Sequence, residues 1–199
     1  MKRKSKEKSR AGKFFFYLIL MGFVLSMLFL YDRGLFHPLS LWLEKGGIRR
    51  ETKEVVLYFS DHEGGYLIGE KRAILKRDEV EEEAKEIVIE LIKGPKGKRI
   101  STLPSQTKLL AFQLGGRGVA QINFDQAFLR DHPGGSSAEM MTVYSIVNSL
   151  TFNFPQIKQV QFLVEGKAIE TIAGHLSLKQ PVPSRPDLIK KTGKNKGKD

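Results

Sequence analysis

Two serines and a histidine stand close together in the stretch HPGGSSAEMMTVYSIVNSL, residues 132–150, and these residue types could support acyl transfer. A nucleophilic serine on a sharp turn follows the pattern G-x-S-x-G, and a histidine held by an acid serves as its base. Here Glu139 stands where that pattern requires its second glycine. A hydrolase function with Ser137 as nucleophile and His132 as base therefore remains an alternative only if the fold brings the two side chains together.

A structural interpretation of this stretch is favoured. A phosphate-binding loop of the P-loop type needs Lys followed by Ser or Thr after its glycines, and this pair is absent here. With Ser136 as N-cap, Glu139 falls at the third helical position, and S-x-x-E is a capping box. Gly134 and Gly135 allow the sharp turn before the cap. The apolar residues that follow at helical spacing predict a buried stripe up to Pro155: Met140, Val143, Tyr144, Ile146, Val147 and Leu150.

An acidic cluster, Glu79 and Glu81–Glu83, has the residue types of a metal site. A calcium loop, however, needs Asp, Asn and Gly at fixed positions, and these are absent. With Asp78 as N-cap, the glutamates fall in the first turns of a helix, where the helix dipole favours negative charge. The other histidines, His37, His62 and His175, are scattered in expected turns. We therefore predict no catalytic, cofactor-binding or metal-binding residues.

The elements that would position these residues are expected to form an α+β fold. Period-two and apolar runs predict strands at 54–60 and 66–75, a hairpin at 107–124 around GGRG, and two strands at 159–174. Helices are predicted at 78–94 and from Ser136 onward. The expected order is β-β-α-β-β-α-β-β, with two helices packed on one face of a mainly antiparallel sheet.

An uncharged apolar run at residues 14–31 predicts one N-terminal transmembrane helix. The basic segment 1–13 places the N-terminus in the cytoplasm by the positive-inside rule, so residues from Asp32 onward are expected outside. A cleaved signal peptide is the alternative, but its apolar region is normally shorter and ends in a small-x-small site, which is absent here. Residues 32–52 are then a juxtamembrane linker. Tyr31 and Trp42 could be interfacial anchors.

The net charge of +11 is concentrated at the two ends of the chain. Residues 1–13 contribute +6 and residues 184–199 contribute +4, so only +1 remains in between. A nearly neutral body argues against nucleic-acid binding, which needs basic residues on the folded face. The chain has no cysteine, which excludes disulfides, thiolate metal sites and a lipid-anchor cysteine.

The last part of the chain, residues 179–199, is predicted to be a basic disordered tail. From residue 183 it holds too little apolar surface to offset the entropy of ordering. A solubilising end is the simpler interpretation. The alternative is electrostatic tethering to anionic lipid or wall phosphates through its lysines: Lys190, Lys191, Lys194, Lys196 and Lys198.

Residues 53–178, about two-thirds of the chain, resemble the GerMN domain family of sporulation and spore germination proteins. The resemblance runs from VVLYFSDHEGGYLIGEKRAI through the turn at Ser101–Pro104 and the Gly134-Gly135-Ser136 helix start to Phe162–Gly166. It implies an extracytoplasmic bacterial domain without known catalytic residues, found in membrane-tethered envelope proteins and similar to ring-building modules. This chain carries one copy and an apolar N-terminal anchor.

Two functions of different classes follow. The first is a membrane-anchored, extracytoplasmic, non-catalytic envelope module, a single-pass protein of the bacterial inner membrane. Its expected partners are the inner membrane, through residues 14–31, and envelope proteins or peptidoglycan, without nucleic acid or cofactor. The second is a cell-wall hydrolase, or a polysaccharide-binding accessory to a cell-wall amidase. An aromatic sugar platform would favour the latter, but Phe112, Phe124 and Phe162 also fit alternating core positions.

Overall fold

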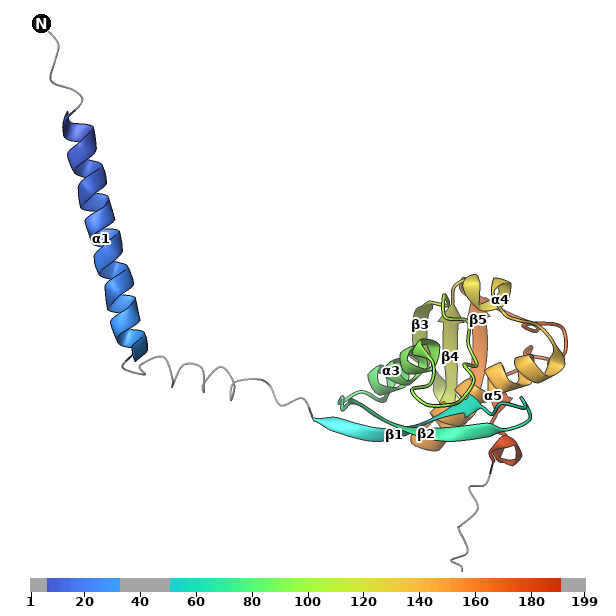
Figure 1. Ribbon diagram of the computed structural model, residues 1–199. Coiled ribbons are helices and arrows are strands. Elements are labelled where there is room, and N and C mark those ends of the chain that lie inside the picture. The colour runs from blue at the N-terminus through green and yellow to red at the C-terminus, as the bar shows by residue number, and fades with distance from the viewer. Residues whose placement is uncertain (1–6, 33–50, 191–199) are drawn as a thin grey trace, which may run out of the picture. The chain divides into compact units, whose positions relative to one another are not determined.

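The computed structural model describes residues 7–32 and 51–190, which belong to two separate units, one within residues 1–49 and one within residues 50–199. Residues 33–50 of the predicted linker, with Trp42 and His37, lie outside the described residues, as do the first six residues, the tail lysines after Lys190 and the side chain of Tyr31. Asp32 is the last residue of the N-terminal helix and Thr52 already belongs to the first strand, so the predicted linker bounds were too wide. Figure 1 shows the order of the elements along the chain.

Helix α1 (Glu7–Asp32) covers the apolar run that the sequence predicts to span a membrane (Figure 1). Its large apolar side chains are exposed, for example Phe14 at 66% and Leu28 at 58%. The side chains of α1 are described from residue 13 to residue 29. Within the described residues, no helix is both long enough and apolar enough to cross a membrane. The predicted transmembrane helix is therefore not confirmed.

The folded unit begins with the predicted hairpin of β1 (Thr52–Ser60) and β2 (Leu67–Leu75), which pair antiparallel from Thr52 opposite Leu75 to Ser60 opposite Leu67. Side chains of a strand alternate between its two faces. Val55, Leu57 and Phe59 accordingly point into the core and are almost fully buried.

Helix α3 (Val80–Lys93) follows, and Gly94 ends it as predicted. Its N-cap is Glu79 and no side chain caps it, so the prediction of Asp78 as N-cap is wrong. Two of its glutamates instead hold neighbouring segments. Glu83 is buried, pairs with Lys53 Nζ at 2.8 Å and accepts the backbone N–H of Arg77, and Glu81 accepts the backbone N–H of Leu114.

The second sheet has the order β3-β4-β5-β6, and β7 also pairs with β5. Its strands are β3 (Leu109–Leu114), β4 (Val119–Phe124), β5 (Gln159–Val164), β6 (Lys167–Ala168) and β7 (Val182–Pro183). The 3₁₀ turns η1 (Gly116–Gly118) and η2 (Pro186–Leu188), the short helix α4 (Ala127–Arg130) and helix α5 (Ser136–Asn153) complete the unit.

The α+β class and the mainly antiparallel pairing are confirmed, but the prediction of a single sheet is wrong. The strands form two sheets instead of one, the chain adds α4 and β7, and β4 pairs parallel with β5. The physical reason is the crossover: α5 returns the chain to the starting end of β4, so that β5 runs in the same direction. The periodicity of a strand does not reveal the direction of its neighbour.

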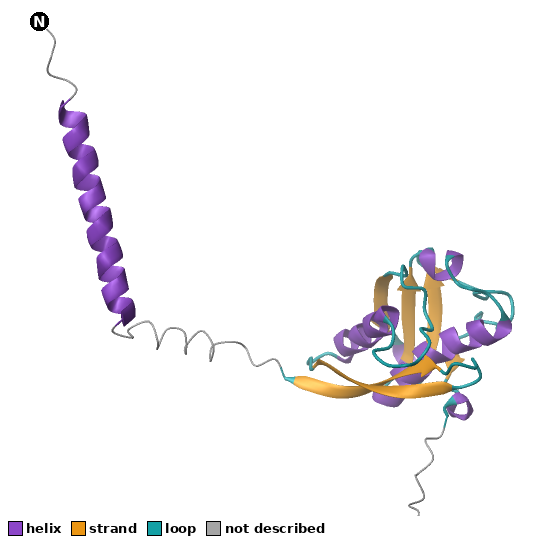
Figure 2. Ribbon diagram, in the orientation of Figure 1, coloured by secondary structure: helices purple, strands orange, loops and turns teal. Residues whose placement is uncertain are grey.

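The two long helices of the folded unit join its two sheets. Helix α5 packs against β1, β5 and α3, and α3 also packs against β2 and β3 (Figures 1 and 2). Three phenylalanines stack inside the larger sheet's core. The ring centroids of Phe124 and Phe128 lie 4.4 Å apart, and those of Phe128 and Phe162 lie 6.3 Å apart.

The C-terminal segment is ordered up to residue 190, so the predicted disorder is wrong for residues 179–190. Leu188 is buried, and the backbone of Arg185 exchanges two hydrogen bonds with the side chain of Asn148, at 2.9 and 3.0 Å. The backbone N–H of Lys190 donates to Leu67 O at 2.8 Å. This segment is short in apolar residues, but the body of the domain supplies the partners.

Candidate functional site

A groove of about 380 Å³ lies at the start of α5. Three segments form it: the turn of the first hairpin, the loop after α3, and the first turns of α5 with the residues before them. The lining residues are Ser60–Gly64, Ile100–Pro104, Pro133, Ser137, Ala138, Met141 and Thr142. Among the described residues, its lining includes the acidic Asp61 and Glu63 but no Lys or Arg. The lining is therefore acidic, while the excess of basic residues lies towards the two ends of the chain.

Asp61 organises the hairpin turn from inside the groove wall. Its Oδ1 accepts the backbone N–H groups of Gly65 at 3.0 Å and Tyr66 at 3.2 Å. Its Oδ2 has no hydrogen-bond donor, and the ammonium of Lys190 lies 3.6 Å away. Burial alone would raise the pKa of the Asp61 carboxyl, but the two backbone N–H groups and the charge of Lys190 outweigh it and hold this pKa below its ordinary value. Asp61 is thus a buried anion near neutral pH.

The helix start differs from the predicted capping box. Gly135 is the N-cap with φ at 84°, a left-handed conformation that favours glycine, and Ser136 is already the first helical residue. No side chain caps the helix. The hydroxyl of Ser137 donates to Gly64 O, which ties the hairpin turn to α5.

Glu139, expected to complete the capping box, is fully buried and holds a different segment. Its carboxylate accepts the Thr171 hydroxyl and the backbone N–H groups of Ile172 and His175, the latter two at 2.8 Å. Burial alone would raise the pKa of Glu139, but these donors outweigh it and lower the pKa. A carboxylate in the first turn of α5 therefore fixes the loop that follows β6.

His132 is bound to other partners than Ser137. Its Nδ1 accepts the backbone N–H of Gly134 at 3.1 Å, and its Nε2 lies 3.0 Å from Thr142 Oγ1. Because Thr142 Oγ1 donates its proton to Thr102 O, the Nε2 position carries the proton of the neutral ring. Burial lowers the pKa of His132 and outweighs the charge of Glu139, which would raise it. The lowered pKa favours the neutral ring. The structure does not form the pair of Ser137 and His132 that a hydrolase needs.

A polar stripe along α5, which the sequence patterns above do not predict, binds the free edge of β1. Asn153 Oδ1 accepts the Val56 N–H at 2.9 Å, and its Nδ2 donates to Val56 O at 2.7 Å. Ser149 Oγ accepts the Tyr58 N–H at 2.9 Å, and the Ser145 hydroxyl donates to Tyr58 O. Side chains of a helix thus replace a neighbouring strand. The available signal was the spacing of Ser145, Ser149 and Asn153, four residues apart, which puts them on one helix face.

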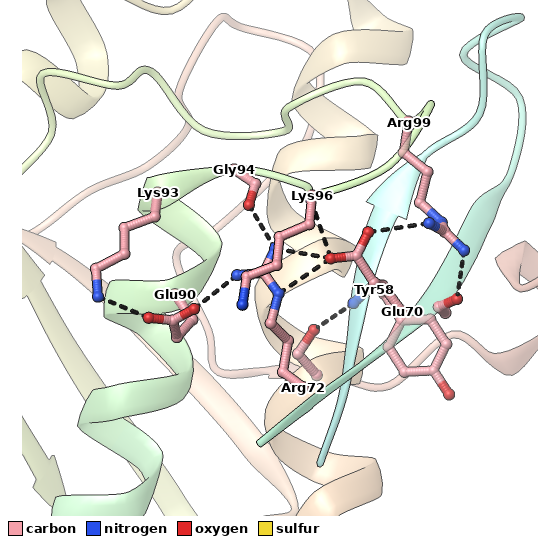
Figure 3. Close-up of polar contacts among 10 residues, drawn as sticks. Tyr58, Glu70, Arg72, Glu90, Lys93, Gly94, Lys96 and Arg99 are labelled. Atoms are coloured by element: carbon pink, nitrogen blue, oxygen red, sulfur yellow. Dashed lines mark hydrogen bonds and ion pairs between the residues drawn. The ribbon is translucent and has the colours of Figure 1, made fainter. Parts of the chain in front are cut away.

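A buried ion network holds the loop after α3, which leads to the groove (Figure 3). The Arg72 side chain is 2% exposed. It donates to Glu70 Oε1 at 2.7 Å, to Glu90 Oε2 at 2.6 Å and to Gly94 O at 2.8 Å. The charge of Arg72 is therefore fully surrounded by acceptors from β2, α3 and the loop.

Glu70 extends this network towards the groove. It accepts the Lys96 backbone N–H at 3.1 Å and the guanidinium of Arg99 at 2.9 Å (Figure 3). Burial alone would raise the pKa of Glu70, but the Lys96 N–H and Arg72 outweigh it and lower the pKa. Ile100, which follows Arg99 in the chain, donates its backbone N–H to Ser60 O at 3.0 Å. The network thereby sets the position of the groove wall at 100–104.

The other proposed chemistries find no support in the described residues. Phe112, Phe124 and Phe162 are buried in the core, so they form no sugar platform. In the part of the chain that the structure describes, no group of three or more His, Asp or Glu side chains is placed to hold a metal ion.

The comparisons with known proteins place these features in a family context. The model of the family Germane, described as sporulation and spore germination, matches residues 56–170. No significant match is found among curated proteins.

Three solved structures are similar in fold. The tandem GerMN domains of the sporulation protein GerM from Bacillus subtilis match with a TM-score of 0.56 at 21% identity, over 73% of this chain and 51% of that one. The first GerMN domain of the same protein matches with 0.53 at 22% identity, over 68% and 100%. A presumed lipoprotein from Clostridium perfringens matches with 0.50 at 25% identity, over 69% and 93%. About half of the tandem structure is covered, which corresponds to one domain copy.

Proposed function

Because the chain belongs to the Germane family of sporulation and spore germination domains, we propose that it is a non-catalytic interaction module of the bacterial cell envelope. The observation that carries this proposal is the bonding at the groove. Ser137 donates to Gly64 O, and His132 binds Gly134 and Thr142. The side chains that could do chemistry hold loops in place, so the groove is built as a fixed binding surface.

Attachment to the inner membrane through residues 14–31 is part of the proposal. The run is uncharged and follows a basic segment, and the large apolar side chains of α1 are exposed to a degree unusual for a soluble helix. Burial of apolar surface contributes about 25 cal/mol per Å². Insertion into a lipid bilayer would remove the apolar side chains of this helix from water. The similarity to a presumed lipoprotein supports an envelope location.

The membrane part is tested by fractionation of cells that express the full chain. We expect the protein in the membrane fraction, and a reporter fused after Asp199 should be active only outside the cytoplasm. The double variant Leu20→Arg, Val24→Arg puts two charges into the apolar run and should release the protein. The matched control, Ile89→Arg with Leu110→Arg, changes two exposed residues of the folded unit and should stay with the membrane. Release of both variants, or cytoplasmic reporter activity, would contradict the attachment.

The non-catalytic part is tested by incubating the purified full chain in detergent with purified cell wall. If no soluble wall fragments are released, the result agrees with the proposal, whether or not the chain binds the wall. Release of fragments that Ser137→Ala abolishes, while the variant keeps the unfolding midpoint of the parent, would establish a hydrolase instead. Crosslinking in whole cells, followed by identification of the captured envelope proteins, tests the interaction role itself.

A further inference from the structure

One buried carboxylate oxygen in the groove wall has no hydrogen-bond donor. Asp61 is 4% exposed, and its Oδ2 receives no hydrogen bond. The nearest cation is the ammonium of Lys190, at 3.6 Å, which is longer than a hydrogen bond. A buried anionic oxygen without a donor is costly, so a donor brought to this oxygen would be bound favourably.

The remaining lining suits the hydrocarbon part of a long basic side chain. Ile100 is 46% exposed at the groove, and Leu103, Pro104, Pro133 and Met141 line it as well. Lysine and arginine bury their stems along apolar surface and keep the charged end at a polar group. The groove volume of about 380 Å³ lies within the usual range of ligand pockets, about 300–1,000 Å³.

The charge of the groove selects the sign of its ligand. Among the described residues, Asp61 and Glu63 line it and no Lys or Arg does, while Lys190 pairs with Asp61 from beside the lining. The uncompensated charge that remains is negative, which favours a cationic over an anionic ligand. Lys190 shows that an ammonium group is tolerated beside Asp61.

From these observations we infer that the groove binds a segment of an envelope protein through an arginine or lysine side chain, which donates to Asp61 Oδ2 and lays its stem on the apolar lining. This inference rests on the proposed interaction role and names the chemistry of the partner. The basic side chain of the ligand takes the place of Lys190 beside Asp61 Oδ2, where Lys190 forms only a long ion pair.

The test uses the full chain in detergent and two pools of fluorescent heptapeptides with apolar and small flanking residues. The pools differ only in the central residue, which is arginine in one and glutamine in the other. In anisotropy titrations the arginine pool should bind at least tenfold more tightly. Asp61→Asn should remove this difference. Its Oδ1 still accepts the Gly65 and Tyr66 N–H groups, so the turn is retained.

Two further variants guard against an indirect effect. Ile100→Lys places a competing cation at the groove and should also abolish the preference, whereas Leu110→Lys, equally exposed on β3, should not. Asp131→Asn, an exposed carboxylate paired with Arg130, should leave binding unchanged. Lys190→Gln removes the competing ammonium and should tighten binding of the arginine pool by several-fold.

Equal binding of the two pools, or an unchanged preference in Asp61→Asn, would overturn the inference. Displacement of the arginine peptides by soluble peptidoglycan fragments would assign the groove to the cell wall and would overturn it as well. If no peptide binds while crosslinking in cells still captures envelope proteins, the inference about the groove fails and the interaction role stands.

Discussion

Replacing Glu139 by glutamine would show how strongly a buried carboxylate of α5 holds the C-terminal loop. One of its oxygens accepts the Thr171 hydroxyl and the Ile172 N–H, and the other accepts the His175 N–H. Glutamine has nearly the same shape but offers an NH₂ group in place of one oxygen. The His175 N–H then faces a donor and loses its acceptor.

The expected loss follows from these contacts. A hydrogen bond to a charged group contributes about 1.5–3 kcal/mol, and a neutral one about 0.5–1.5 kcal/mol. Glu139→Gln loses one charged bond and weakens the others, while the neutral side chain is easier to bury. We expect the free energy of unfolding to fall by about 2–3 kcal/mol. The thermal midpoint should fall by about 4–12 °C, at about 2–4 °C per kcal/mol.

The assay is urea unfolding of the full chain, followed by far-ultraviolet circular dichroism, together with hydrogen exchange. Exchange at the backbone N–H groups of Ile172 and His175 should speed up before global unfolding. Glu82→Gln makes the same substitution in the first turn of α3, where the side chain is exposed, and should leave the midpoint unchanged. A loss below about 0.5 kcal/mol in Glu139→Gln, with exchange at both groups unaltered, would refute the reasoning.

The pH dependence supplies a second readout of the same carboxyl. Its pKa is lower in the folded chain than its ordinary value of 4.5. The stability it contributes is therefore fully present above the ordinary value and is lost as the pH falls through the lower, folded value. Glu139→Gln should unfold with a flatter dependence on acid pH than the parent. An identical acid limb in both proteins would contradict the assigned pKa direction.

Three further predictions concern the other buried polar contacts. Arg72→Leu leaves Glu70 and Glu90 without their shared cation and should cost about 3–5 kcal/mol in urea unfolding, whereas Lys71→Leu, exposed on the same strand, should cost far less. Asn153→Ala leaves the N–H and carbonyl of Val56 without their partner and should cost about 1–3 kcal/mol, with faster hydrogen exchange at Val56. Ser136→Ala should change stability by no more than about 0.5 kcal/mol, because Ser136 caps nothing; a loss of a full cap contribution would restore the capping box.

Much of the local structure is predictable from residue order. The alternation of Val55, Leu57 and Phe59 predicts the first strand, and the apolar spacing before Gly94 predicts α3. These patterns are local, since side-chain direction repeats every two residues in a strand and every 3.6 in a helix. The family resemblance extends this to the domain as a whole, and the family match at residues 56–170 confirms it.

The roles of individual polar residues were less predictable. Ser136 and Glu139 fit a capping box by spacing, but Glu139 binds a loop more than thirty residues away. The acidic residues of α3 fit a solvated helix start, but Glu83 is buried against Lys53. A spacing rule gives the near partners of a side chain, and a distant donor in a dry environment can bind it more strongly.

The sequence by itself determined the strands of the first hairpin, the two long helices of the domain and the separation of charge between the ends and the body, because each depends on neighbouring residues only. The tertiary structure alone decided that β4 and β5 run parallel and that α5 binds the edge of β1. It also decided that Asp61 lies in a groove beside Ser137, whose hydroxyl reaches across 73 positions to Gly64. Contacts between distant segments depend on how complete elements pack, and burial then determines which polar groups must find each other.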